Sequence, residues 1–272
     1  MTISSRLTFK PLLQRSAVAL AMAALSVGAS AALPAFTLDP TAASLSGPSF
    51  AGDNLLISNY STIRFDGFGG FTDTGFLSVS AVQLLGTTFA PAGLNAVSGL
   101  GYGMYFAFTG AGTTTLGNPA LVPTIATFTS LTFTMYGYNG LASFGFDGSN
   151  NPTETASGEV ALATGTMISA NGVTVPTGDG LTFNPSAAAK LTFDTSGAPA
   201  GFFATPNPFY DVAFAAFTNT TSQVHPFAGG FSIDQGGGAV NFAATPVPEP
   251  ETYALMLGGL AAVGFIARRR RT

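Results

Sequence analysis

Short segments in which apolar and polar residues alternate recur through the body of the chain. In YGMYFAF, which begins at Tyr102, the even-numbered positions are large and apolar. In SLTFTMYGY, Leu131, Phe133 and Met135 alternate with threonine and tyrosine, and GFLSVSAV, AKLTFDT and DVAFAAFT follow the same rule. Successive side chains of a strand point to opposite faces, so this period predicts antiparallel strands with one buried and one wet face.

The spacing of these segments predicts a single all-β domain over residues 32–245. That length exceeds a minimal immunoglobulin-like domain, so we expect an antiparallel two-sheet sandwich or jelly roll. The segments GNPALVPT and DGSNNPTETASG are predicted loops, and DQGGGAVNF is predicted to hold a glycine turn before a last strand.

Composition agrees with a folded body and excludes several kinds of site. Only 8% of residues are charged, against about 25% in ordinary soluble proteins, and 46% are hydrophobic. Disordered chains show the reverse balance. The absence of cysteine excludes disulfides, thiolate metal sites and cysteine nucleophiles.

The N-terminal residues have the pattern of a secretory signal peptide. Arg6, Lys10 and Arg15 precede an apolar run from 16 to 27, and Ala29-Ser30-Ala31 follows. A basic start, a short apolar stretch and small residues at the cut site define such signals. We predict cleavage after Ala31, with residues 1–31 removed.

The C-terminal residues predict a short membrane segment. Residues 252–267 carry no charge and would span about 24 Å as a helix, against about 30 Å for a bilayer core. Four arginines, Arg268, Arg269, Arg270 and Arg271, follow and are expected on the cytoplasmic side. The body then lies outside, which is the side that the signal peptide also predicts.

The body between 32 and 247 is acidic. It holds two basic residues, Arg64 and Lys190, against eleven acidic ones, a net charge of −9. Nucleic-acid affinity comes chiefly from basic contacts to phosphates, so no nucleic-acid partner is expected.

The C-terminal segment, residues 246–272, resembles the PEP-CTERM sorting domain. Pro248-Glu249-Pro250, a short transmembrane helix and the four terminal arginines occur together and in that order. The resemblance implies export by a Gram-negative bacterium that makes exopolysaccharide, a transient inner-membrane anchor, and processing by an exosortase. Prolines hold the backbone extended, so we expect the tripeptide to be accessible at the membrane surface. A plain tail anchor is the alternative.

A second resemblance covers residues 34–110. The segments PAFTLDP, AGDNLLISNYSTI, FDGFGGFTDTGFL and GLGYGMYFAFTG are similar to the flocculation-associated PEP-CTERM family of floc-forming bacteria. The resemblance implies a protein that helps exopolysaccharide hold cells together.

No catalytic site is expected. A Ser-His-Asp triad would need the single histidine, His225, which we interpret as a satisfied or exposed loop residue. Glycoside hydrolysis needs two carboxyl groups about 5 to 9.5 Å apart. If Glu154 and Glu159 share one strand, their spacing of five puts them on opposite faces, and aspartate pairs stay open.

Other short motifs have ordinary structural interpretations. Asp66-Gly67, Asp147-Gly148 and Asp179-Gly180 could offer oxygen ligands to calcium, but Asp-Gly is also a tight-turn signature, which we favour. GLGYGMYF lacks the full nucleotide-binding pattern and is interpreted as a glycine-bent strand.

Two asparagines, in NYS at Asn59 and NTT at Asn219, fit the glycosylation pattern and are interpreted as exposed loop residues. No metal or cofactor is expected.

The sequence therefore predicts an exported, exosortase-processed, non-enzymatic matrix protein that acts with exopolysaccharide in flocculation or biofilm. The alternative is a surface carbohydrate-binding module, because tyrosine rings offer flat faces to sugars. The candidate rings, most of which we expect in the core or at its rim, are Tyr60, Tyr102, Tyr105, Tyr136, Tyr138 and Tyr210.

Overall fold

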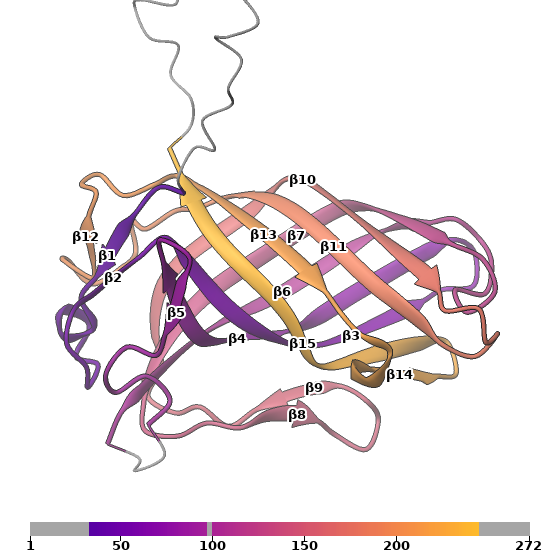
Figure 1. The fold of residues 1–272 in the computed structure, drawn as a ribbon, viewed down its shortest axis with the longest axis horizontal. Helices are drawn as coiled ribbons and strands as arrows, with labels where there is room; N and C mark the ends of the chain where they lie inside the picture. Colours follow the sequence, from indigo (N-terminus) through magenta and orange to yellow (C-terminus); the bar gives the residue numbers. More distant parts are fainter. Residues whose placement is uncertain (1–32, 97–99, 245–272) are drawn as a thin grey trace, which may run out of the picture. The chain divides into compact units, whose positions relative to one another are not determined.

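The computed structural model describes residues 33–96 and 100–244, and these residues form an all-β fold (Figure 1). The long strands are β3 (Asn54–Phe65), β4 (Gly70–Leu84), β6 (Tyr102–Thr114), β7 (Thr124–Asn139), β10 (Val160–Pro176), β11 (Phe183–Thr192), β13 (Val212–Thr218) and β15 (Gly230–Ala243). The short elements are β1 (Phe36–Leu38), η1 (Pro40–Ala43), β2 (Phe50–Gly52), β5 (Thr87–Phe89), β8 (Phe144–Phe146), β9 (Pro152–Glu154), β12 (Phe203–Thr205), η2 (Thr221–Gln223) and β14 (Val224–Phe227).

The eight long strands form one closed antiparallel barrel. They pair in the order β13-β11-β10-β7-β6-β4-β3-β15, and β13 pairs back to β15 from Val212↔Ala243 to Thr218↔Gly237. The prediction of an all-β fold is confirmed, and the prediction of a sandwich or jelly roll is wrong. Both architectures bury one face of each strand, but closure also satisfies the two edges that an open sheet would leave unpaired.

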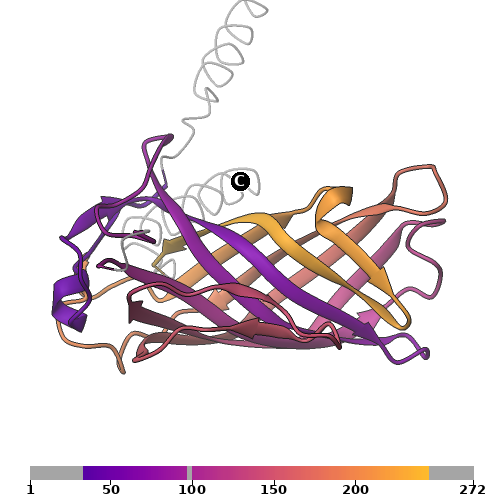
Figure 2. The same cartoon turned by 90° about the horizontal axis from the view of Figure 1, so that it is seen from below.

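A small sheet of order β12-β1-β2 packs into one end of the barrel (Figures 1 and 2). Phe36 and Leu38 of β1 and Leu45 after η1 belong to the same buried cluster as Met104 and Met135 of the barrel. Because these side chains are at most 4% exposed, this end is closed by apolar packing.

A second buried cluster lies toward the other end of the long strands. It includes Ile63 of β3, Phe71 of β4, Phe183 of β11 and Phe231 of β15. Ala120, from the loop between β6 and β7, packs into the same cluster. The predicted GNPALVPT loop therefore also contributes to the interior.

The predicted inward face of β6 and β7 is confirmed, since Tyr102, Met104 and Met135 are fully buried. The predicted wet face is wrong in part, because Tyr105 and Tyr138 on the opposite face are each 2% exposed. Two predicted loops are partly wrong. Residues 152–154 form β9, which pairs with β8 as a hairpin, and Gly236 and Gly237 lie within β15 instead of in a turn. A register shift between Ile233 and Gly236 places a bulge at Asp234 and Gln235, directly before the glycines, which pair regularly with β3.

Among residues 33–96 and 100–244, no helix is long and apolar enough to cross a membrane. The predicted signal peptide, with Ala29 and Ala31, lies outside the described residues, as does the predicted helix at about 252–267.

Candidate functional site

Four of the six candidate tyrosines form one aromatic cluster on the outer face of the barrel. Tyr105 is at the centre, with ring centroids 5.3 Å from Tyr136 and 6.0 Å from Tyr138. The β8–β9 hairpin brings Phe144 against this cluster, 5.4 Å from Tyr105 and stacked at 5.6 Å on Tyr60. Figure 1 shows β8 and β9 running along the outside of the barrel.

A glycine on β6 makes room for this cluster. Gly103 is the cross-strand partner of Tyr138, and a Cβ at Gly103 would lie 2.2 Å from the Tyr138 Oη. The Tyr138 ring therefore lies over the backbone of Gly103 and is 2% exposed. This contact explains Gly103, one of the three glycines in GLGYGMYF, without a nucleotide.

Both glutamates of the body approach the same tyrosine. The Tyr105 hydroxyl donates a hydrogen bond to Glu159 Oε1. Burial raises the pKa of Tyr105, and the hydrogen bond to Glu159 and the charge of Glu154 raise it further. Glu154 and Glu159 do not share a strand, since Glu154 ends β9 and Glu159 precedes β10. The prediction that they lie on opposite faces of one strand therefore does not apply. The residues between them let the chain turn both toward the cluster.

An open hollow of about 310 Å³ borders the aromatic cluster. Tyr60, Tyr138 and Phe144 give it aromatic walls, and Ser78, Asn95 and Ser143 also line it. Burial raises the pKa of Tyr138 to about 12, so its phenol stays protonated in the physiological range. This hollow combines flat apolar faces with neutral hydrogen-bonding groups.

The other two candidate tyrosines lie elsewhere. Tyr102 points into the barrel and is fully buried, and its hydroxyl has no hydrogen-bond partner. Tyr210 donates from its hydroxyl to the Ala35 carbonyl, at 2.8 Å. Neither belongs to the outer cluster.

The turn interpretation of the Asp-Gly pairs is confirmed. Asp66 Oδ1 accepts from the amides of Phe68 and Gly70, at 2.7 and 2.9 Å, and Gly67 has φ +80°. These bonds lower the pKa of Asp66. Hydrogen bonds also lower the pKa of Asp147 and of Asp179. The largest effect comes from the Asn151 side chain at Asp147 and from the Thr182 hydroxyl at Asp179. In the described part of the chain no group of three or more acidic or histidine side chains could hold a metal.

His225 is exposed, as expected, but it lies on β14, where it pairs with Ser232 of β15, and not in a loop. The interpretation of Asn59 and Asn219 as exposed loop residues is wrong. Asn59 is 5% exposed within β3, and Asn219, directly after β13, is 3% exposed. A glycan could not reach either nitrogen in the folded barrel.

Comparison with known proteins bears on the C-terminal segment. A family model described as the PEP-CTERM protein-sorting motif matches residues 246–271. The matched span contains all predicted sorting residues: Pro248, Glu249, Pro250, Arg268, Arg269, Arg270 and Arg271. These residues lie outside the described part of the structure.

No curated protein and no solved structure matched the chain. The resemblance of residues 34–110 to the flocculation-associated family stays a prediction. Because the family model and the order of motif, apolar run and arginines agree, the chain carries a PEP-CTERM protein-sorting motif, which marks an exported protein that an exosortase processes.

Proposed function

We propose that this protein is a non-enzymatic component of the extracellular matrix that promotes flocculation or biofilm formation together with exopolysaccharide. The observation that carries the proposal is the sorting motif at residues 246–271. An exosortase releases the protein from its transient membrane anchor to the cell surface, where it meets the polysaccharide.

The outer surface of the barrel supports a polysaccharide partner. Thr109, Thr132 and Thr166 are direct cross-strand neighbours on β6, β7 and β10, and the Thr166 hydroxyl lies 3.2 Å from that of Thr192 on β11. All four side chains are exposed. This row of uncharged hydroxyls offers donors and acceptors to neutral sugars without the desolvation cost that charged groups carry.

A complementation experiment tests the proposal. Deleting the gene is expected to abolish flocculation, and the wild-type gene is expected to restore it. Glu249→Ala is expected to leave full-length protein in the membrane, because it alters the proposed recognition tripeptide, and so to restore little flocculation. Western blots of membrane and matrix fractions, with mass spectrometry of the released C-terminus, provide the measurement.

Glu251→Ala is the matched control, since it removes the same charge two residues away and outside the tripeptide. It is expected to behave like the wild type. A deletion strain that still flocculates, or a matrix-released protein that ends at Thr272, would contradict the proposal.

A second candidate function is direct carbohydrate binding, which the hollow beside Tyr60, Tyr138 and Phe144 favours. An aromatic ring stacks on the apolar face of a sugar, and serine and asparagine groups hydrogen-bond its hydroxyls. Of these rings Tyr60 is the better test, because Tyr138 is almost fully covered.

Tyr60→Ala is expected to weaken binding of the purified exopolysaccharide by about tenfold, because loss of one stacking ring removes about 1 kcal/mol or more. Tyr60→Phe, which keeps the ring, is expected to retain most of the affinity. Isothermal titration calorimetry gives both values. Equal affinities for Tyr60→Ala and the wild type would exclude this hollow as the sugar site.

A further inference from the structure

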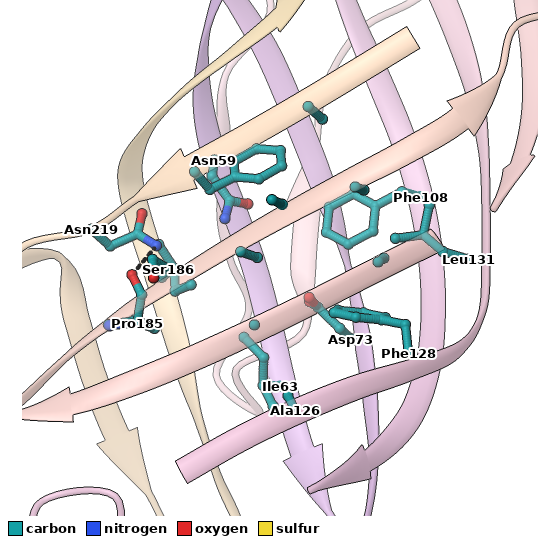
Figure 3. Close-up of a pocket in the computed structure, with 18 of the residues that line it drawn as sticks. Asn59, Ile63, Asp73, Phe108, Ala126, Phe128, Leu131, Pro185, Ser186 and Asn219 are labelled. Atoms are coloured by element: carbon teal, nitrogen blue, oxygen red, sulfur yellow. Dashed lines mark hydrogen bonds between the residues drawn. The ribbon is translucent and has the colours of Figure 1, made fainter. Parts of the chain in front are cut away.

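The barrel contains a partly open cavity of about 130 Å³ that both buried clusters line. Leu77 and Phe133 of the first cluster and Phe71 and Phe231 of the second all line it. Figure 3 shows this interior space, with side chains from several strands pointing into it. Protein interiors are normally packed without voids larger than a water molecule, so a space of this size requires an explanation.

The cavity exists because three neighbouring strands present small residues to the interior. Ala187 and Ala189 of β11 and Ala213 and Ala215 of β13 line it, with Gly172 of β10. Ala189 and Ala215 are direct cross-strand partners. Eight-stranded barrels are either filled by their own side chains or hold one small ligand. Here the small residues leave the space unfilled.

Four polar side chains that line the cavity each leave one buried atom without a hydrogen-bond partner. These atoms are Asn59 Oδ1, Asp73 Oδ1, Thr174 Oγ1 and Asn219 Oδ1. Unsatisfied buried polar atoms are rare in native proteins, and their concentration around one cavity points to a missing partner. The amide oxygens only accept hydrogen bonds, so that partner must be a donor.

Two of these oxygens belong to asparagines that lie beside Gly236 of β15. Gly236 is the cross-strand partner of Asn59, and a Cβ at Gly236 would lie 2.0 Å from Asn219 Oδ1. The Asn219 amide nitrogen donates to the Pro185 carbonyl at 3.1 Å, which fixes the oxygen's orientation. Figure 3 shows Asn59 and Asn219 at the same side of the space. The two asparagines form the polar end of the cavity.

An apolar rim lies where the loop after β6 meets the cavity. Pro119 of this loop lines the cavity, while Leu116 and Leu121 are exposed. A methyl group at Gly180, in the turn after β10, would touch Leu121, and Leu181 beside it is also exposed. Exposed apolar clusters commonly mark binding surfaces. This apolar rim lies beside the part of the cavity that Pro119 lines.

We propose that the barrel cavity binds a small neutral alcohol or phenol, with its apolar part among the phenylalanines and its hydroxyl donating to Asn59 or Asn219. An apolar cavity of about 150 Å³ holds benzene, so the ligand has about six to ten non-hydrogen atoms. Water could donate hydrogen bonds to the asparagine oxygens, but it would gain no favourable contact with the apolar walls. A small molecule with one hydroxyl and an apolar part makes both the hydrogen bond and the apolar contacts. This proposal does not rest on the proposed role in flocculation, because ligand binding to the purified protein is measured separately from the behaviour of cells.

Calorimetric titration of the purified full chain with p-cresol and with toluene tests the proposal. The two probes differ by one hydroxyl, so p-cresol is expected to bind at one site about tenfold more tightly than toluene, the value of one satisfied hydrogen bond. Ala215→Leu fills the cavity and is expected to abolish binding of both probes. Ala216→Leu, on the outer face of the same strand, is the matched control and is expected to bind like the wild type.

Ala189→Leu, on the neighbouring strand, gives an independent cavity-filling variant if Ala215→Leu does not fold, and circular dichroism checks folding in each case. No binding of p-cresol to the wild type would overturn the proposal. Toluene binding as tightly as p-cresol would overturn the assignment of the asparagines as hydroxyl acceptors. Undiminished p-cresol binding to a folded cavity-filling variant would place the site elsewhere and would equally overturn it.

Discussion

Phe242→Ala is expected to lower the free energy of unfolding by about 3 to 5 kcal/mol. Phe242 is fully buried near the C-terminal end of β15, the strand that closes the barrel. Its ring centroid lies 5.3 Å from Phe36, 4.7 Å from Phe193 and 5.5 Å from Phe209. Truncation therefore leaves a void where β15 meets the end sheet and the segment between β11 and β13, in addition to removing the transfer energy of the ring.

Phe68→Ala is the matched control, because Phe68 is 92% exposed in the turn between β3 and β4. Its effect is expected to stay within about 0.5 kcal/mol. Urea unfolding of the purified full chain, followed by circular dichroism, measures both variants. A loss below 1 kcal/mol for Phe242→Ala would mean that the end sheet does not pack against the barrel as described.

The strands could be predicted from the sequence, but the closed barrel could not. Alternation in β6 and β7 identifies which side chains face the barrel interior, and the structure confirms it for Met104, Phe133 and Met135. A sandwich and a barrel use the same alternation. What separates them is the pairing of β13 with β15, and local periodicity carries no information about which edges meet.

Glycines within the strands are a sequence feature that indicates a strongly curved sheet, and alternation alone does not include it. A Cβ at Gly165, on β10, would lie 2.1 Å from the Thr192 carbonyl oxygen and 2.3 Å from the Phe133 ring. A Cβ at Gly112, on β6, would meet the Thr127 carbonyl and the Phe71 ring. Glycines inside strands allow the tight curvature that a closed sheet needs, and they let neighbouring rings lie on the backbone.

Part of the candidate site can also be predicted from the alternation of residues along the strands. Parity on β6 separates Tyr102 from Tyr105, and the structure places them on opposite faces. Alternation does not reveal the β8–β9 hairpin that completes the aromatic cluster, because its strands are three residues long. The glycosylation pattern at Asn59 is misleading, because its position two residues after Ile57 and four before Ile63 puts it on the buried face.

The stability of the folded barrel is expected to fall as pH rises from about 4 to about 7, because of Asp73. Burial raises the pKa of this carboxyl from 3.8 to about 7, and the neighbouring Ser61 hydroxyl opposes the rise only in part. In this window the unfolded chain releases the proton while the folded chain retains it. The unfolded state therefore binds fewer protons, and the free energy of unfolding decreases with pH, by up to about 4 kcal/mol in total.

Urea unfolding of the full chain at pH 4, 5, 6, 7 and 8 measures this slope. Asp73→Asn, which resembles the neutral carboxyl in shape, is expected to flatten it and to make the protein more stable than the wild type at pH 8. Asp194→Asn is the control. Its exposed carboxylate accepts from the Ser196 amide, which lowers the pKa of Asp194, so its contribution is lost only as pH falls below about 4. That variant is expected to keep the wild-type slope between pH 5 and 7. An equally steep slope in Asp73→Asn would show that another group in the barrel binds the proton.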